Sequence, residues 1–425
     1  MFLFKLKAGA LQLTLFISVI IALIITGFIL LVHTYNQFKI QTDFIIETVQ
    51  ISNKGIREAL ISTIPLNDTT YLDINAKDFK TLKVYREFWG VFDKVTSIGK
   101  IKNNTLKQVA LIGAIQSQNN RTALHIQDNN RPLVVVGNTN IEGVAYLPKR
   151  GVKSGNISGQ SYYGSQLIYG EKRLSSTLPK LSNETITQLE SIENISSNIE
   201  HNQILRLENG KTFLNSFLDK KKIALSNSEI RLSNINLVGN IVIQSKTKII
   251  VEASANLKDV ILIAPEIIIK DLVKGSFQAI ASKNIEVGKQ SNLEYPTALI
   301  LMEKEMKPIN DSSIHTNHNR IFIDENSSLK GVVIFLSKPK TKNYNPQIKL
   351  EEKGTIIGEI YCTENLELNG TVYGSVFTNN FIAKQSGSVY QNHIYNGIIT
   401  INKLPQEYVG LTFNDSKIGV LKWLY

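Results

Sequence analysis

The sequence predicts a mainly β protein with an N-terminal transmembrane helix and its amphipathic extension, a small antiparallel β region, and then a parallel β-solenoid with a helical and polar insertion. Three observations support this fold class. No charged residue occurs from Ala8 to Phe38. Short apolar runs alternate with turn signals over residues 81–137. Farther along, an apolar-x-Gly-x-apolar motif recurs, with steps of 16–17 residues between its best copies.

Composition sets outer bounds on the protein class. The 425 residues suit two or three domains, and a hydrophobic content of 43% with 20% charged residues excludes global disorder. The single cysteine, Cys362, excludes an intramolecular disulfide framework and a multi-cysteine metal site. Lys+Arg minus Asp+Glu gives 47 − 36 = +11. Outside a cell, this charge favours anionic envelope polysaccharide or lipid head groups as partners.

Residues 11–33 are predicted to form a single transmembrane helix behind a basic leader at 1–10. Leu11–Val32 is apolar enough and long enough for a bilayer core, which takes about 20 residues. Lys5 and Lys7 precede it, so we expect a cytoplasmic N-terminus and a periplasmic or extracellular bulk, as in a single-pass inner-membrane protein. A cleaved signal peptide is the alternative, but the apolar run is too long and no small-x-small site follows it.

Residues 34–64 are predicted to continue this helix with one apolar face. The stripe has spacings of three and four residues, and Pro65 marks its end. A helix of about 50 residues would be about 75 Å long. The members of the stripe are Phe38, Thr42, Ile45, Val49, Ser52, Ile56 and Leu60.

This layout resembles the type IV pilin and pseudopilin superfamily, whose members have a basic leader, a glycine cleavage point, a hydrophobic helix and an amphipathic extension. The residues that match the processing point are Gly9 and Ala10. Most pilins carry Glu five residues after the cleavage point, where this chain has Thr14; some large minor pseudopilins and PilX-like proteins also lack that Glu. The resemblance covers about the first 60 residues and implies other pilin-like or envelope-assembly subunits as partners. A plain membrane anchor with a helical stalk is the alternative.

The rest of the chain divides by pattern into five parts. We expect an antiparallel meander at 65–132, first solenoid coils at 133–160, and an insertion at 161–234 that contains a helix near Thr185–Ile195. The main solenoid is predicted at 235–395. The segment 396–425 is predicted to cap the last coil with the aromatic residues Tyr408, Phe413, Trp423 and Tyr425.

The repeat predicts a β-solenoid because a 16–17-residue step is too short for a βαβ unit. The best copies place Ile356, Val372 and, in a decayed copy, Val389 at equivalent points. Glycine at a corner permits positive φ, so a β-branched replacement such as Gly374→Val should destabilise the fold by more than about 1 kcal/mol. Glu367 is expected to be exposed, so Glu367→Gln should be near neutral. The predicted corner glycines are Gly143, Gly159, Gly239, Gly275, Gly331, Gly358 and Gly374.

The Gly-punctuated coils at Lys353–Tyr390 resemble the bactofilin, or polymer-forming cytoskeletal, β-helix family. Bactofilins assemble end to end into filaments without nucleotide. The likeness fades upstream, and the size, the loops and the expected exterior location of this chain depart from the family. A capped monomer and a polymer are therefore both open.

The sequence gives no catalytic, cofactor or metal site. Glycoside-cleaving solenoids need carboxylates stacked on adjacent coils, and the acids here form no such column, so we expect no enzyme. His315, His318 and Asp311 are interpreted as solvent-exposed loop residues and Cys362 as a buried core residue. The basic charge lacks the aromatic interleaving of a nucleic-acid reader, so no nucleic-acid partner is expected.

The hypothesis from sequence is a membrane-anchored extracytoplasmic structural or assembly protein of the bacterial envelope. Its sharper form is a large minor pilin or pseudopilin-like subunit of a type IV pilus or type II secretion-like machine. The alternative is a membrane-anchored carbohydrate-binding or carbohydrate-cleaving β-helix protein, which an exposed aromatic ladder on one solenoid face would favour.

Overall fold

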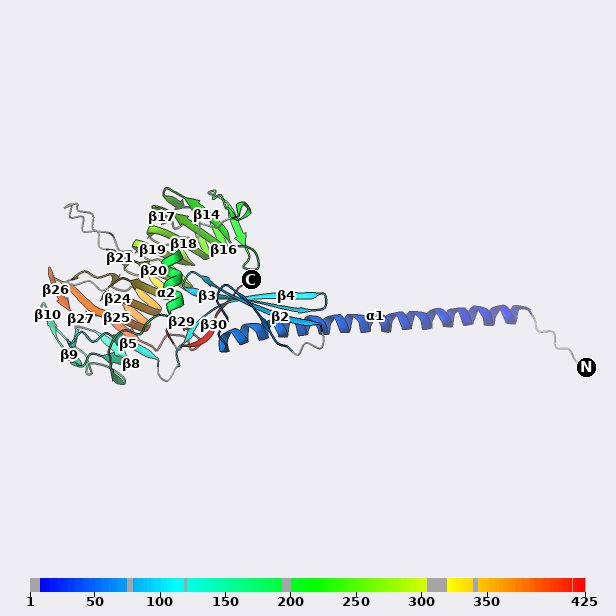
Figure 1. Ribbon diagram of the computed structural model, residues 1–425, viewed down its shortest axis with the longest axis horizontal. Helices are drawn as coiled ribbons and strands as arrows, with labels where there is room; N and C mark the ends of the chain where they lie inside the picture. Colours follow the sequence, from blue (N-terminus) through cyan, green and yellow to red (C-terminus); the bar gives the residue numbers. More distant parts are fainter. Residues whose placement is uncertain are drawn as a thin grey trace, which may run out of the picture.

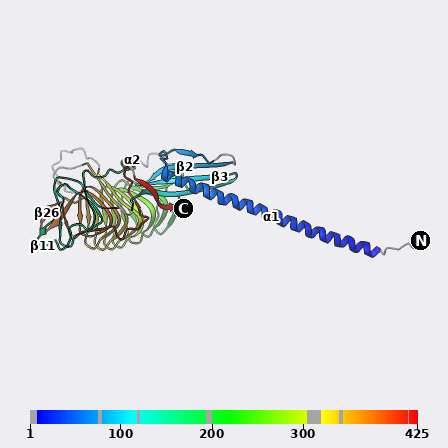
Figure 2. The same cartoon turned by 90° about the horizontal axis from the view of Figure 1, so that it is seen from below.

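The computed structural model describes residues 8–74, 79–117, 121–192, 200–303, 319–338, 343–414 and 416–424. Three layers follow one another: a long helix, an antiparallel sheet and a parallel β-solenoid. The helix extends far from the β layers, and the coils of the solenoid stack beside the sheet (Figures 1 and 2). This arrangement confirms the predicted fold class.

The first layer is helix α1 (Ala8–Ile61), a single helix of 54 residues. Residues 9–43 of this helix are exposed, whereas Ile51, Ile56 and Ala59 near its end are buried against the sheet. The predicted transmembrane and amphipathic segments therefore form one continuous helix. It ends four residues before Pro65, because the residue that precedes a proline disfavours the helical conformation.

The second layer is a six-stranded antiparallel sheet that places apolar side chains on both faces. Leu82 and Val95 face α1, whereas Phe92 and Leu111 face the solenoid, as the period-2 alternation of strands requires. Its strands are β1 (Thr69–Leu72), β2 (Lys80–Trp89), β3 (Phe92–Ile101), β4 (Asn104–Ile115), β29 (Val409–Gly410) and β30 (Lys417–Leu424).

The third layer is the solenoid, in which each strand pairs in parallel with strands of the coils before and after it. Ile356 lies opposite Leu329 on one side and Val372 on the other, so the predicted 16-residue step from Ile356 to Val372 corresponds to one coil. Inward Ile, Val and Leu side chains from all coils form one continuous core. The main strands are β16 (Asn236–Ser245), β17 (Lys248–Val251), β18 (Asn256–Ile269), β19 (Lys274–Val287), β20 (Asn292–Met302), β21 (Arg320–Ile323), β22 (Ser328–Leu336), β23 (Ile348–Leu350), β24 (Thr355–Leu368), β25 (Thr371–Gln385) and β28 (Ile398–Thr400).

Residues 122–174 stack beyond β25 and β28, although they precede the main coils in sequence. The meander prediction is wrong for residues 122–132, because β5 pairs in parallel with β25 and places Leu124 and Ile126 in the solenoid core. The terminal coils contain β5 (Thr122–Ile126), β6 (Leu133–Val136), β7 (Asn140–Glu142), β8 (Val144–Leu147), β9 (Val152–Ser154), β12 (Lys172–Leu174) and β27 (His393–Tyr395).

The segment expected to be an insertion, 161–234, is a connector followed by the opposite end of the solenoid. Residues 175–192 contain α2 (Asn183–Ser191), whose Leu189 packs with Leu181 on the outer face of the coils. The insertion prediction is wrong for residues 212–232, which pair in parallel with β16 and β17. This end coil contains the short helix η4 (His201–Gln203), β13 (Thr212–Asn215), β14 (Lys222–Ser226) and β15 (Ile230–Leu232).

Several predicted repeat registers differ from the structure. Val372 is followed by Ile399, not Val389, because β26 (Ser388–Gln391) folds back antiparallel onto β25. Gly159 lies in a hairpin between β10 (Asn156–Ile157) and β11 (Gln160–Ser161), outside the coil corners. Gly275 lies opposite Leu257 and so occupies the place of an inward residue.

The predicted C-terminal cap is also wrong, because the last coil is followed by residues from the N-terminal half. The tail instead returns to the antiparallel sheet, where β29 and β30 pair with β4. Phe413 packs on Phe377 along the side of the solenoid, and Trp423 is 41% exposed. Tyr425 lies outside the described residues. The solenoid is therefore an insertion between β4 and β29 of the small sheet.

The central corner glycines form a column in register. Gly331, Gly358 and Gly374 lie opposite one another on consecutive coils with φ of +141°, +148° and +151°. A Cβ atom at Gly374 would lie 1.9 Å from the Gly358 carbonyl oxygen, so only glycine fits this stack. Gly143, Gly159 and Gly239 also have positive φ, whereas Gly275 does not. Glu367, expected to be exposed, is 2% exposed.

Candidate functional site

Two surfaces of the structure are candidates for function, and the first is the exposed apolar surface of α1. Its apolar side chains are solvent-exposed from Leu11 at 72% to Ile46 at 51%. This is the one helix in the described part of the chain that is long and apolar enough to cross a membrane. Leu11–Val32 spans 22 residues, or about 33 Å, which matches the hydrocarbon thickness of about 30 Å.

The exposed apolar surface continues past the segment that a bilayer would cover. Lys39 and Asp43 are charged side chains on α1 beyond Val32, so the hydrocarbon core does not extend over them at low cost. Large apolar side chains on this part of α1 are nonetheless 48–67% exposed. We call these residues the juxtamembrane stripe; they are Tyr35, Phe38, Ile40, Ile45 and Ile46.

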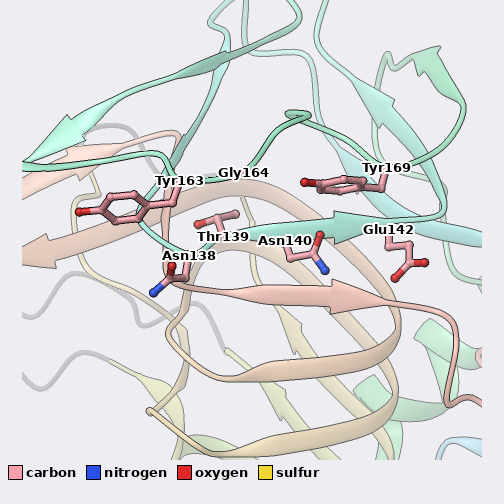
Figure 3. Close-up of a pocket in the computed structure, with 7 residues that line it drawn as sticks. All are labelled: Asn138, Thr139, Asn140, Glu142, Tyr163, Gly164 and Tyr169. Atoms are coloured by element: carbon pink, nitrogen blue, oxygen red, sulfur yellow. The ribbon is translucent and has the colours of Figure 1, made fainter.

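The second surface is a polar cleft at the end of the solenoid, with a volume of about 350 Å³. One wall is strand β7 with the turn before it, and the other is the segment 163–169 (Figure 3). These coils lie at the end of the molecule farthest from the N-terminus of α1 (Figure 1). We call this feature the terminal cleft; its lining residues are Asn138, Thr139, Asn140, Glu142, Tyr163, Gly164 and Tyr169.

The backbone of the terminal cleft is fixed by hydrogen bonds to both neighbouring coils. The amide of Asn140 donates to the Gly397 carbonyl at 3.1 Å, and Tyr169 donates to the Ile141 carbonyl at 2.8 Å. The buried Thr139 hydroxyl donates to the Val136 carbonyl at 2.7 Å. The cleft is therefore held in shape before any ligand arrives.

The two tyrosines of the cleft differ in their surroundings. The Tyr169 hydroxyl accepts a hydrogen bond from the Ser165 amide at 3.2 Å and lies 3.2 Å from the Ser165 hydroxyl. These bonds lower the pKa of Tyr169 below its ordinary value and fix its ring. Tyr163 is 66% exposed, and no hydroxyl partner for it occurs among the described residues.

The solenoid also has an aromatic ladder, but most of it is covered. Tyr361, Phe377, His125 and Tyr146 occupy one column, with ring centroids 6.5, 6.4 and 5.1 Å apart. The tail and connector cover Tyr361 and Phe377, which are 5% and 4% exposed. Burial lowers the pKa of His125 to about 4, so this imidazole is neutral and structural. Tyr361 and Phe377 are therefore not available as an open sugar-binding face, whereas His125 and Tyr146 are half-buried.

A buried carboxylate lies where the solenoid joins the sheet. Glu359 accepts hydrogen bonds from the Gln116 side chain at 2.8 Å and from the Leu411 amide at 2.6 Å. Gln116 follows β4, where the chain leaves the antiparallel sheet, and Leu411 follows β29, where it returns. The Glu359 carboxylate on β24 therefore links the solenoid to both of these segments. Burial raises the pKa of Glu359 to about 7. Because both oxygens are occupied inside the protein, Glu359 is a structural group.

The residues singled out from sequence do not meet at one site. Gly9 and Ala10 lie at the exposed start of α1, and Cys362 is fully buried. His315, His318 and Asp311 lie outside the described residues. Within the described ranges, no group of three or more His, Cys, Asp or Glu residues is arranged to hold a metal ion.

Sequence reasoning missed the terminal cleft. Its one signal is the polar spacing Asn138-x-Asn140-x-Glu142, in which Asn140 and Glu142 share one face of β7, Asn138 lies in the preceding turn, and Ile141 points into the core. The opposite wall, with Tyr163 and Tyr169, has no such pattern. Its position follows from a coil register that the sequence does not show.

Comparisons with known proteins give a likeness to solved structures. No family model matches the chain, and no curated protein matches it. A solved structure, the competence-associated pilin ComZ from Thermus thermophilus, is similar over 85% of this chain and 86% of that chain, with 11% identity and a TM-score of 0.22.

Proposed function

We propose that this chain is a membrane-anchored, extracytoplasmic structural subunit of a bacterial envelope assembly, in which α1 packs against the helices of neighbouring subunits. The sharper form of the proposal is a large minor pilin-like subunit that presents the solenoid at a distance from the membrane. A non-catalytic role is part of the proposal.

The observation that carries this proposal is the juxtamembrane stripe. A plain anchor needs an apolar surface only within the bilayer, yet Phe38 and Ile45 are 65% and 56% exposed beyond Val32. At about 25 cal/mol per Å² of apolar surface, several exposed side chains of this size favour burial by a few kcal/mol. Neighbouring helices of an assembly supply that burial, and lipid does not, because Lys39 and Asp43 lie between these side chains.

The organisation of the β layers also supports the proposal. The sheet buries one face on α1 and the other on the solenoid, so the helix is rigidly joined to the inserted coils. Gln278 on β19 accepts from the Val91 amide at 2.9 Å and donates to the Trp89 carbonyl at 2.8 Å. A subunit whose helix is fixed in an assembly would therefore hold the terminal cleft in a fixed position.

End-to-end stacking of solenoids, as in bactofilins, stays a prediction. Leu205 and Leu207 pack against the core at the first coil, which leaves less apolar surface there for a second copy. Attraction of the +11 chain to anionic envelope polysaccharide also stays a prediction.

Mass spectrometry of the N-terminal peptide tests the pilin-like form. We expect a mature chain that begins at Ala10, because processing after Gly9 removes the basic leader that holds the helix in the inner leaflet. Gly9→Val should then block processing. An N-terminal peptide that begins at Met1 and continues through Ala10, recovered from functional protein, would leave only the membrane-anchored solenoid.

Protease treatment of spheroplasts tests the orientation separately. A C-terminal tag should be removed from intact spheroplasts, since the lysines of the leader place the N-terminus inside. A tag that is cut only after lysis would contradict the exterior location.

A further inference from the structure

We infer that the terminal cleft is a binding site for an uncharged sugar of a surface glycan. This inference concerns a surface at the opposite end of the molecule from α1, and it is independent of whether α1 enters an assembly. It rests on the shape of the cleft, on its unpartnered polar groups and on its charge.

The cleft has the size and rigidity of a small-ligand site. Its volume of about 350 Å³ lies within the usual range for ligand pockets, about 300–1,000 Å³. Strand β7 lies between β28 and the 168–170 segment, so the wall that carries Asn140 and Glu142 is held on both sides. The second wall is fixed where the Tyr163 amide donates to the Gly137 carbonyl at 3.0 Å.

Several polar groups in the cleft have no partner among the described residues. The side chains of Asn138 and Asn140 and the hydroxyl of Tyr163 make no hydrogen bond there. Glu142 accepts one hydrogen bond, through Oε2 from the Thr400 hydroxyl at 3.1 Å, which leaves Oε1 open. Figure 3 shows these side chains along the two walls of the same cleft. Together they offer amide donors, amide acceptors and a carboxylate acceptor.

A sugar ring matches this set of groups better than a charged or purely apolar ligand. Hydroxyl groups on adjacent ring carbons both donate and accept, so amides and a carboxylate can satisfy them in pairs. The rings of Tyr163 and Tyr169 give apolar surface for the C–H face of the sugar while their hydroxyls stay polar. Glu142 is the one charged side chain in the lining, so an acidic sugar would be repelled.

The lining favours binding without cleavage. Glycoside hydrolysis ordinarily uses two carboxyl groups about 5–9.5 Å apart, one as acid and the other as base or nucleophile. The lining includes one carboxylate, Glu142.

The test uses the detergent-solubilised full chain on arrays of neutral oligosaccharides, amino-sugar oligosaccharides and uronic acid polymers. We expect retention of neutral glycans that does not weaken as salt is raised from 50 to 500 mM. Tyr163→Ala should lower retention at least tenfold. Tyr71→Ala is the matched control, since Tyr71 is 68% exposed on β1, far from the cleft in the chain and in the fold, and it should bind as the unchanged protein does.

Three outcomes would overturn the inference. They are no neutral glycan retained above background, equal losses for Tyr163→Ala and Tyr71→Ala, and retention of uronic acid polymers alone with loss at high salt. Glu142→Gln keeps an acceptor oxygen, so neutral glycans should stay bound within threefold. Loss of amino-sugar binding alone in this variant would show that the ligand is cationic, and this fourth outcome would also overturn the inference. Equal unfolding midpoints verify that each variant is folded. Leader processing and orientation do not involve the cleft, so failure here leaves the proposed function untouched.

Discussion

Replacement of Gly374 by alanine tests the stacked-corner geometry of the solenoid. The new Cβ would lie 1.9 Å from the Gly358 carbonyl oxygen, which is a backbone atom held in the parallel ladder. Alanine at φ +151° adds backbone strain of about 1–3 kcal/mol. Moving the carbonyl oxygen by about 1 Å weakens one or two ladder hydrogen bonds, each worth about 1 kcal/mol. The expected loss in free energy of unfolding is therefore about 2–5 kcal/mol, or about 2 kcal/mol more than a positive-φ glycine with free space around it would lose.

Gly387→Ala is the matched control for this change. Gly387 also has a positive φ, of +76°, but its Cβ would meet nothing within 4 Å, so only a conformational cost of about 1–2 kcal/mol remains. At about 2–4 °C per kcal/mol, Gly374→Ala should melt about 4–8 °C below Gly387→Ala in circular dichroism of the full chain. Equal melting temperatures for the two variants would refute the stacked corner.

Three further predictions concern ionisable side chains. Burial raises the pKa of Glu359 to about 7, above its ordinary value of 4.5, so between these pH values the folded state keeps a proton that the unfolded chain has lost. The free energy of unfolding should therefore fall by about 3 kcal/mol as pH rises from 4.5 to 7. Thermal melts of Glu359→Gln over the same pH range should lack this fall. Lys422→Met removes the contact of Nζ with Asp259 at 2.6 Å, which is partly exposed, so we expect a loss of about 1 kcal/mol in urea unfolding and faster proteolysis of β30; an unchanged β30 would contradict a stabilising role. Burial raises the pKa of Cys362 to about 12, so maleimide should label this thiol only in denaturant, and fast labelling of native protein would show that the coil opens.

The local elements were predictable from sequence because each has its own periodicity. The uncharged run and the three-and-four spacing specify α1, and the repeat from Ile356 to Val372 specifies parallel coils. Asp259 takes the glycine place of the apolar-x-Gly-x-apolar motif in residues 257–261, and its φ is +56°, a conformation that aspartate tolerates.

The order of the coils was not predictable, because it depends on contacts between segments far apart in sequence. The sequence of Thr122–Ile126 suits a strand with either an antiparallel or a parallel neighbour. Only its parallel pairing with β25 shows that it belongs to the solenoid. Ser388–Gln391 keeps the glycine and β-branched pattern of a coil, yet it forms a hairpin. The terminal cleft was missed for the same reason, since Glu142 and Tyr169 become neighbours only through the coil register.

Labelling of cysteines introduced on α1, with Cys362 buried in the solenoid core, tests the central claim, which is that neighbouring subunits cover the juxtamembrane stripe. Ile45→Cys reports on the stripe, and Ile61→Cys, at an 84% exposed position at the end of the same helix, is the control. With an impermeant maleimide on spheroplasts, we predict that Ile45→Cys is protected until detergent separates the subunits, whereas Ile61→Cys is labelled throughout. Equal labelling of the two cysteines on intact spheroplasts would contradict the assembly and leave α1 as a plain anchor.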